Sequence, residues 1–286
     1  MTTPLPALPN IAVLSPLVTR ILGQNPGPFC LQGTNTYLIG CPSQNERILI
    51  DTGEGLDAYA TLLHKYLKTT KFRLSAIVVT HWHPDHVKGV PSILAGLDYS
   101  PAVYKVLNPE KDEPTRKYSP LKDGDVLNTA GVSLDVLHTP GHARDHVCLW
   151  LAKEKCLFTA DNVLGHGTTV FEDYHAYITS LRRMLAIPSL GRLYPGHGQL
   201  VEDGPAKIKE YIEHRLEREQ QVVEAMQSLG RAVDSMEITK IIYGESQHPK
   251  LYAAADRGVQ LYLIKLEHDG VVRESENRWT LVHGKL

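Results

Sequence analysis

The chain has 286 residues, of which 42% are hydrophobic and 22% are charged, and its formal net charge is −2. Such a composition is that of an ordinary globular protein, and the length is enough to bury one large core or two smaller ones. The near-neutral charge excludes an overall basic field of the kind that attracts nucleic acid. No apolar run approaches the ~20 residues that would cross a membrane, so we expect no membrane partner.

The N-terminus and the cysteines bear on the cellular compartment. The first residues, Met1-Thr2-Thr3-Pro4, do not form a basic segment followed by an apolar core, so we expect no secretory signal. The four cysteines show no CxxC spacing, which favours reduced thiols over metal ligands. A cytoplasmic location is therefore predicted.

The first third of the chain alternates strands and a helix. Short strands are expected within 9–22 and 35–40, and a further strand over 47–50 ends at Asp51. Apolar residues recur at helical spacing over 57–69, and residues 74–79 form an apolar, β-branched strand. This order indicates a mixed α/β sandwich rather than a helical bundle.

That last strand leads directly into Thr80-His81-Trp82-His83-Pro84-Asp85-His86, where three imidazoles and a carboxylate fall within six residues. Imidazole and carboxylate together suit divalent metals. The theme recurs at the ends of three later predicted strands. The full set of candidate metal ligands is His81, His83, Asp85, His86, His142, Asp161 and His197. These five imidazoles and two carboxylates exceed what one tetrahedral ion takes, so we expect two metals, zinc first, per chain.

A two-metal site predicts a hydrolase. Metal binding lowers the pKa of water from 15.7 to ~7, so a metal-bound hydroxide can attack without a serine or cysteine nucleophile. We expect Asp85 to orient that water while it binds metal. Asp51, at a strand end, is expected to hydrogen-bond a ligand histidine. His166 and Asn35 are candidates either for the substrate cleft or for contacts that support the metal ligands.

The last part of the chain predicts a separate module. Apolar residues recur at helical spacing over 205–229, which indicates a long amphipathic helix. Further helices are expected over 236–243 and 251–268. Two strands, 271–273 and 278–281, would then pair as a hairpin. Helices followed by a hairpin indicate a winged-helix-like module. We therefore divide the chain into a catalytic domain, 1–204, and a C-terminal module, 205–286, which we expect to wall one side of the cleft.

The HxHxDH cluster, followed by Gly141-His142, Asp161 and Gly196-His197, resembles the metallo-β-lactamase superfamily. The resemblance implies an αβ/βα sandwich with a two-metal site at one sheet edge. It also implies that one metal is held by His81, His83 and His142. The other would be held by Asp85, His86 and His197, with Asp161 as the bridge.

Further stretches, such as residues 31–37, 49–54 and 167–173, resemble the β-lactamase-like protein 2 subfamily over essentially the whole chain. Its animal members are single-strand-specific endoribonucleases associated with mitochondria. Its fungal members include thioesterases that release polyketides from an acyl carrier protein.

The resemblance and the residues leave several functions open. We favour a metal-dependent thioesterase whose partner is the acyl carrier protein of a polyketide synthase or a small acyl thioester. The alternative is an endoribonuclease that cleaves single-stranded RNA, with the mitochondrial matrix as its location. A β-lactam substrate ranks third, and a non-catalytic binding protein is a remote alternative because the ligand set is complete.

Overall fold

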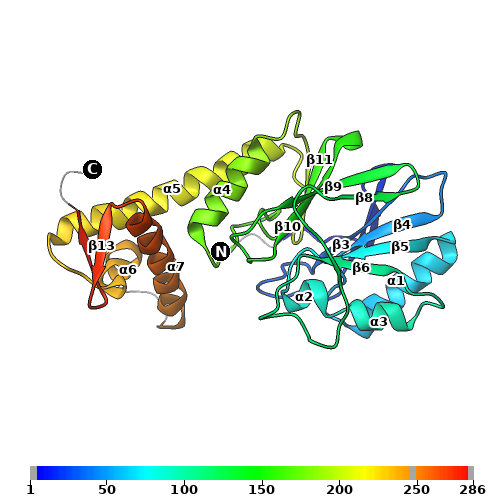
Figure 1. Cartoon of the computed structure of the whole chain (residues 1–286), viewed down its shortest axis with the longest axis horizontal. Coiled ribbons are helices and arrows are strands. Elements are labelled where there is room, and N and C mark those ends of the chain that lie inside the picture. Colours follow the sequence, from blue (N-terminus) through cyan, green and yellow to red (C-terminus); the bar gives the residue numbers. More distant parts are fainter. Residues whose placement is uncertain (1–4, 245–248, 283–286) are drawn as a thin grey trace.

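The computed structural model describes residues 5–244 and 249–282. Two β-sheets face one another in the larger part of the molecule, and a small helical module lies beside them (Figure 1). The first sheet is mixed and has seven strands in the order β1-β2-β3-β4-β5-β6-β7. Its strands are β1 (Ile11–Val13), β2 (Val18–Leu22), β3 (Asn35–Ile39), β4 (Glu46–Ile50), β5 (Arg73–Val78), β6 (Ala102–Lys105) and β7 (Ser119–Pro120).

The second sheet has five strands in the order β12-β11-β10-β9-β8. Its strands are β8 (Val126–Thr129), β9 (Val132–His138), β10 (Val147–Leu151), β11 (Cys156–Ala160) and β12 (Leu193–Pro195). All its neighbouring pairs are antiparallel except β11 and β12, which run parallel. Because β11 and β12 are parallel, their carboxyl ends deliver Asp161 and His197 to the same edge of the sheet.

Buried residues alternate between the two faces of the first sheet. In β4, Ile48 and Ile50 belong to the core between the sheets, whereas Leu49 belongs to the core beneath the helices. This period of two follows from strand geometry. Helices α1 (Asp57–Thr70) and α3 (Val90–Ala95) cover the outer face, and the short helix α2 (Pro84–Val87) carries the later part of the histidine cluster.

The outer face of the second sheet is covered by α4 (Tyr174–Leu185) and the start of α5 (Gly204–Leu229). The layers therefore run helix, sheet, sheet, helix, and the predicted αβ/βα sandwich is confirmed. This arrangement places the carboxyl ends of strands from both sheets beside each other.

The C-terminal module consists of α6 (Ser235–Tyr243), α7 (Pro249–His268) and a hairpin of β13 (Val272–Ser275) and β14 (Arg278–Leu281). The expected helices and hairpin are present, each within a few residues of the predicted limits. Asp234 caps α6 in a reciprocal capping box with Glu237. The module joins the sandwich through aromatic packing, with the Tyr262 ring of α7 centred 4.4 Å from that of Tyr174 on α4.

Helix α5 connects the two parts and extends along much of the molecule (Figure 1). Its first turns pack in the same buried cluster as α4, and its later residues share that cluster with α6 and α7. The division between residues 204 and 205 stays a prediction, because this helix packs on both parts. Among the described residues, every helix is too short or too polar to cross a membrane.

Candidate metal centre

Three imidazoles converge at the edge of the sandwich. His83 Nδ1 lies 2.9 Å from both His81 Nε2 and His142 Nε2, and the latter two nitrogens are 3.3 Å apart. Asp161 completes this first group, since Oδ2 of its carboxylate lies 3.7 Å from His142 Nε2. These residues come from the loop after β5, the loop after β9 and the end of β11, so the carboxyl ends of three strands build the group.

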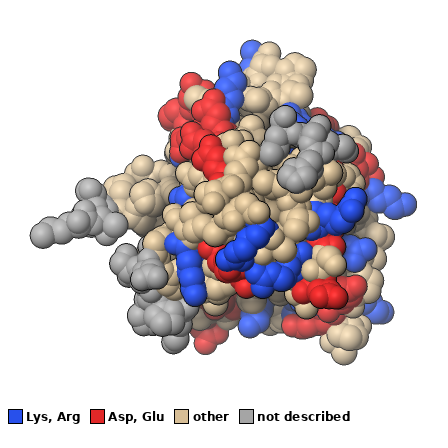
Figure 2. All heavy atoms as spheres, turned by 90° about the vertical axis from the view of Figure 1, so that its left-hand side faces the viewer, with Lys and Arg blue, Asp and Glu red and all other residues tan. Residues whose placement is uncertain are grey.

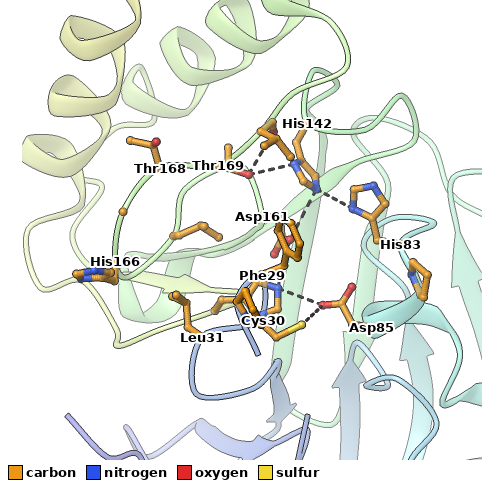
Figure 3. A pocket seen from close by; sticks show the side chains of 16 residues that line it. Phe29, Cys30, Leu31, His83, Asp85, His142, Asp161, His166, Thr168 and Thr169 are labelled. Carbon is orange, nitrogen blue, oxygen red and sulfur yellow. Dashed lines mark hydrogen bonds and ion pairs between the residues drawn. The ribbon is translucent and has the colours of Figure 1, made fainter. Parts of the chain in front are cut away.

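A second group lies against the first. Oδ2 of Asp85 is 3.2 Å from both His86 Nε2 and His197 Nε2. Asp161 also faces this group, with Oδ1 at 3.4 Å from His86 Nε2 and Oδ2 at 3.3 Å from His197 Nε2. One carboxylate thus touches both groups, and Asp161, His142, His83 and Asp85 meet in the middle of the same pocket (Figure 3).

Hydrogen bonds on the far side of the rings fix which nitrogen faces the centre. His86 Nδ1 lies 2.8 Å from Asp51 Oδ2, and His142 Nδ1 lies 2.8 Å from the carbonyl oxygen of Val170. An imidazole that donates from one nitrogen presents a lone pair on the other, which is the form that binds a metal. Both Nε2 atoms point inward in this arrangement.

The charge states suit metal binding in two different ways. Burial lowers the pKa of His83 to about 4 and also lowers the pKa values of His81 and His142, so these rings stay neutral. Burial opposes protonation of His197 too, but the Asp161 and Asp85 carboxylates outweigh it and raise its pKa to about 9. Without metal, a proton therefore balances the carboxylates of the second group, and a metal ion can replace it.

Buried atoms without partners also fit bound ions. Among the described residues, His86 Nε2 and Asp161 Oδ1 are buried and make no hydrogen bond, although they face each other at 3.4 Å. Burying polar atoms in this way is costly unless something binds them. Gly196 keeps the centre open, because a Cβ at this position would collide with Asp161 Oδ1. The donor set and these unpartnered atoms together fit divalent metals.

The remaining candidates take different places. Asp51 lies behind His86, where its carboxylate also accepts from the backbone N–H and hydroxyl of Thr80. His166 is exposed and lines the far edge of the pocket (Figure 3). Of the two places predicted for Asn35, the structure fits a supporting contact rather than the cleft: the residue is buried, and its amide donates to the carbonyls of Pro195 and Gly198. It lies at the start of β3, where it faces the His197 loop.

Sequence reasoning missed residues that surround the centre. The Thr34 hydroxyl donates to Asp85 Oδ2 at 3.0 Å, and Cys30 Sγ lies 3.7 Å from the same oxygen. Cys30 therefore reaches the metal pocket, although the cysteine spacing gave no such signal. His146, in the loop between β9 and β10, is fully buried, with its ring centred 5.2 Å from that of His81. No strand-end motif pointed to this histidine.

The pocket over the centre has a volume of about 360 Å³. Its polar floor holds histidines and carboxylates, and much of its rim is apolar. Phe29 is 84% exposed and Val170 is 67% exposed, so both offer apolar surface at the rim of the pocket. The other apolar residues that line the pocket are Pro28, Leu31, Pro84 and Leu164.

An αβ/βα sandwich with imidazoles and carboxylates gathered at its strand ends defines a class of metal-dependent hydrolases. The chain belongs to the metallo-beta-lactamase superfamily, whose family model matches residues 31–197. The beta-lactamase associated winged helix domain matches residues 235–279, and the predicted module is thereby confirmed. The chain is accordingly a hydrolase of a superfamily that binds metal ions.

Relatives similar to this chain fall on both branches of the predicted subfamily. The "Beta-lactamase-like protein 2 homolog" of Caenorhabditis elegans is 42% identical over 264 residues, which cover 92% of this chain and 88% of that protein. The "Atrochrysone carboxyl ACP thioesterase" of Aspergillus chevalieri is 38% identical over 294 residues, covering 99% and 92%. The predicted subfamily is thus confirmed.

Solved structures support the fold. A metallo-beta-lactamase family protein from Thermus thermophilus superposes with a TM-score of 0.72 at 21% identity, covering 94% of this chain and 100% of that one. Since that coverage includes the region after residue 204, the sandwich and the C-terminal module share an arrangement with a known protein.

Proposed function

We propose that this chain is a dinuclear zinc hydrolase that releases an acyl or polyketide chain from an acyl carrier protein. The observation that carries the proposal is the pocket itself, in which two donor groups joined by Asp161 form the floor and apolar side chains form the rim. The polar floor would bind the thioester carbonyl that is hydrolysed, and the apolar side chains of the rim would contact the acyl chain. The thioesterase name of the Aspergillus relative supports this substrate class.

The donor set divides by geometry. His81, His83 and His142 would hold one ion, and Asp85, His86 and His197 the other, with Asp161 shared between them. Two divalent ions in such a site activate water and polarise the carbonyl that it attacks. Zinc suits this mixture of imidazole and carboxylate.

The protein's own side chains would orient the reactants. Asp85 faces the pocket and is held by the Thr34 hydroxyl through Oδ2, so that its other oxygen, Oδ1, could accept a hydrogen bond from the attacking water. In the net reaction the water oxygen bonds to the acyl carbon, the carbon–sulfur bond breaks, and the leaving thiolate takes up a proton. The hydrogen bond from Thr34 keeps Asp85 oriented for this role.

The test compares the two substrates that the relatives suggest. Zinc-loaded protein is assayed with a hexanoyl thioester of an acyl carrier protein and with single-stranded RNA, and Asp161→Ala serves as the control. We expect thioester hydrolysis that requires Asp161. RNA cleavage that requires Asp161, without any thioester hydrolysis, would instead assign the endoribonuclease function.

A further inference from the structure

A second pocket of about 340 Å³ lies next to the metal pocket. It is bounded by the loop before α4 together with α5, α6 and α7, so the C-terminal module forms one of its walls. The two pockets share Thr168, Thr169 and Val170, which lie between them as a single loop segment. The second pocket contains three guanidinium groups, from Arg215, Arg218 and Arg257, and we call it the arginine pocket.

Arg215 is the most constrained of the three. Its side chain is only 8% exposed, one of its amino groups donates to the carbonyl oxygen of Thr169, and its guanidinium lies 4.9 Å from the ring centroid of Phe171. Its Nε is buried and has no hydrogen-bond partner within 5–244 and 249–282. A buried cation without an anion is costly, so this side of the loop favours an anionic ligand.

Arg218 and Arg257 add positive charge nearer the solvent. Arg218 is half-buried, with its guanidinium 5.2 Å from the ring centroid of Tyr243, whereas Arg257 is exposed on α7. The pKa of His214, which also lines the arginine pocket, responds to this positive charge. Burial lowers its pKa, and the charges of Arg215 and Arg218 lower it further.

Three other basic residues of this part of the molecule are paired with carboxylates. Lys265 pairs with Glu219 and Asp269, and Arg231 and Arg278 both pair with Glu237. By contrast, no carboxylate of the described residues lies within 4.0 Å of a guanidinium nitrogen in the arginine pocket. On the face of the molecule seen from the module, basic and acidic side chains are interleaved rather than arranged in a continuous basic track (Figure 2).

We propose that the arginine pocket binds the phosphodiester of the phosphopantetheine arm on which a carrier protein holds its acyl chain. The inference rests on the proposed function, because it takes the thioester to lie over Asp161 and Asp85. From there the leaving arm can cross the shared segment 168–170 and bring its phosphodiester to the guanidinium groups. Arginine suits this ligand, since its planar fork matches phosphate oxygens.

The shape of the site favours the arm over other anions. A concave pocket encloses a small charged group, whereas the acidic surface of a carrier protein would need a broad, open basic face. The backbone of single-stranded RNA would need a cationic track along its length. A compact group of three guanidiniums in a pocket beside the metal pocket meets the first requirement and neither of the others.

The test uses two small substrates that differ only in the phosphate: hexanoyl-phosphopantetheine and hexanoyl-pantetheine. With the zinc-loaded full chain we expect kcat/KM to be about tenfold higher for the phosphorylated substrate, because charge-assisted hydrogen bonds to phosphate are strong but partly screened here. Most of the difference should appear in KM, and it should shrink as salt is added. Equal kcat/KM values for the two substrates would overturn the inference while leaving the thioesterase function intact.

Variants locate the effect. In the double variant Arg218→Ala/Arg257→Ala the preference for the phosphorylated substrate should fall several-fold toward one, because two of the three guanidinium groups are removed. Arg273→Ala is the matched control, since it removes an exposed arginine from the same module outside the pocket, and it should keep the preference. Arg215 is left in place because it also holds the Thr169 backbone. A preference that survives the double variant, or that Arg273→Ala removes equally, contradicts the assignment.

Single-stranded RNA provides the remaining arm of the experiment. If the double variant loses RNA cleavage or binding while its preference among thioesters is unchanged, the pocket serves RNA and the inference is wrong. If no thioester is hydrolysed by the zinc-loaded wild type, the proposed function fails and the inference fails with it. Hydrolysis of hexanoyl-pantetheine by the wild type distinguishes these two results: it persists when only the inference is wrong, and it is absent when the thioesterase function fails.

Discussion

Asp51 Oδ2 lies 2.8 Å from His86 Nδ1, and both residues are buried. The same carboxylate accepts from the backbone N–H of Thr80 at 2.8 Å and from its hydroxyl at 2.9 Å. Three donors therefore converge on one acceptor-only group that follows β4. Because Thr80 precedes His81, Asp51 links the start of the histidine cluster to its end.

Asp51→Asn should weaken metal binding without disturbing the fold. Asp51 has a φ of 60°, a left-handed conformation that asparagine adopts readily. The amide, however, would point an N–H₂ group at donors that now meet an oxygen. We expect zinc affinity to fall by about 10–100-fold, the usual effect of losing such a partner. Competition with a chromophoric chelator measures the affinity, and an unchanged value would separate Asp51 from the metal centre.

Asn35 supports the opposite side of the centre. Its amide donates to two carbonyls at 2.9 Å, one from Pro195 and one from Gly198, which flank His197. Asn35→Ala would leave the Gly198 carbonyl unpaired, whereas the Pro195 carbonyl would still accept from the Tyr37 hydroxyl, so we expect a cost of about 1–3 kcal/mol. Urea denaturation of the metal-free protein should show this loss in the free energy of unfolding. Asn128→Ala, on the exposed side of β8, should cost less than about 0.5 kcal/mol.

The metal content is itself a prediction. Since the candidate ligands form two groups that share one carboxylate, we expect about two ions per chain at saturating zinc. Removing them with a chelator should abolish hydrolysis and lower the melting temperature, because metal that binds only the folded state stabilises it. Elemental analysis and a thermal melt of the same sample test both points. One ion per chain at saturation would contradict the dinuclear assignment.

The fold was predictable because its signals are local. An apolar strand runs into His81, and Asp161 and His197 each follow a short strand, so topology alone brings them to one edge. The direction in which a single side chain of a strand points is harder to predict, because it depends on how that strand pairs with its neighbours. Asn35 begins β3 and was a candidate for the cleft or for a supporting contact, and pairing with β2 turns it toward the His197 loop.

Long-range contacts explain the other gaps. Cys30 reaches Asp85 only because the segment before β3 folds over the centre, and no local pattern encodes that approach. The arginine pocket draws on Thr169, Arg215 and Arg257, which lie far apart in the sequence. Helical spacing assigned Arg215 to α5 but could not show which loop it would pack against.

Asp161 provides the sharpest test of the centre as a unit. Its two oxygens lie 3.3–3.7 Å from Nε2 of His86, His142 and His197, so the residue touches both ligand groups. Asp161→Ala removes the shared ligand, and Asp161→Asn keeps the shape while halving the oxygen donors. For both variants we expect kcat/KM to fall on the order of 100–1,000-fold or more, comparable to the loss of a group that stabilises the transition state. Bound zinc should drop below two ions per chain in the same samples.

The controls for Asp161 separate chemistry from folding. Circular dichroism and size-exclusion chromatography should show both variants folded, because the Asp161 side chain faces the pocket and packs in no apolar cluster of the described residues. Asp57→Ala, which removes an exposed carboxylate from the first turn of α1, should keep both its activity and its metal content. Near-normal hydrolysis by Asp161→Ala with two bound ions would show that the two groups do not depend on a shared carboxylate, and the bridging role would have to be abandoned.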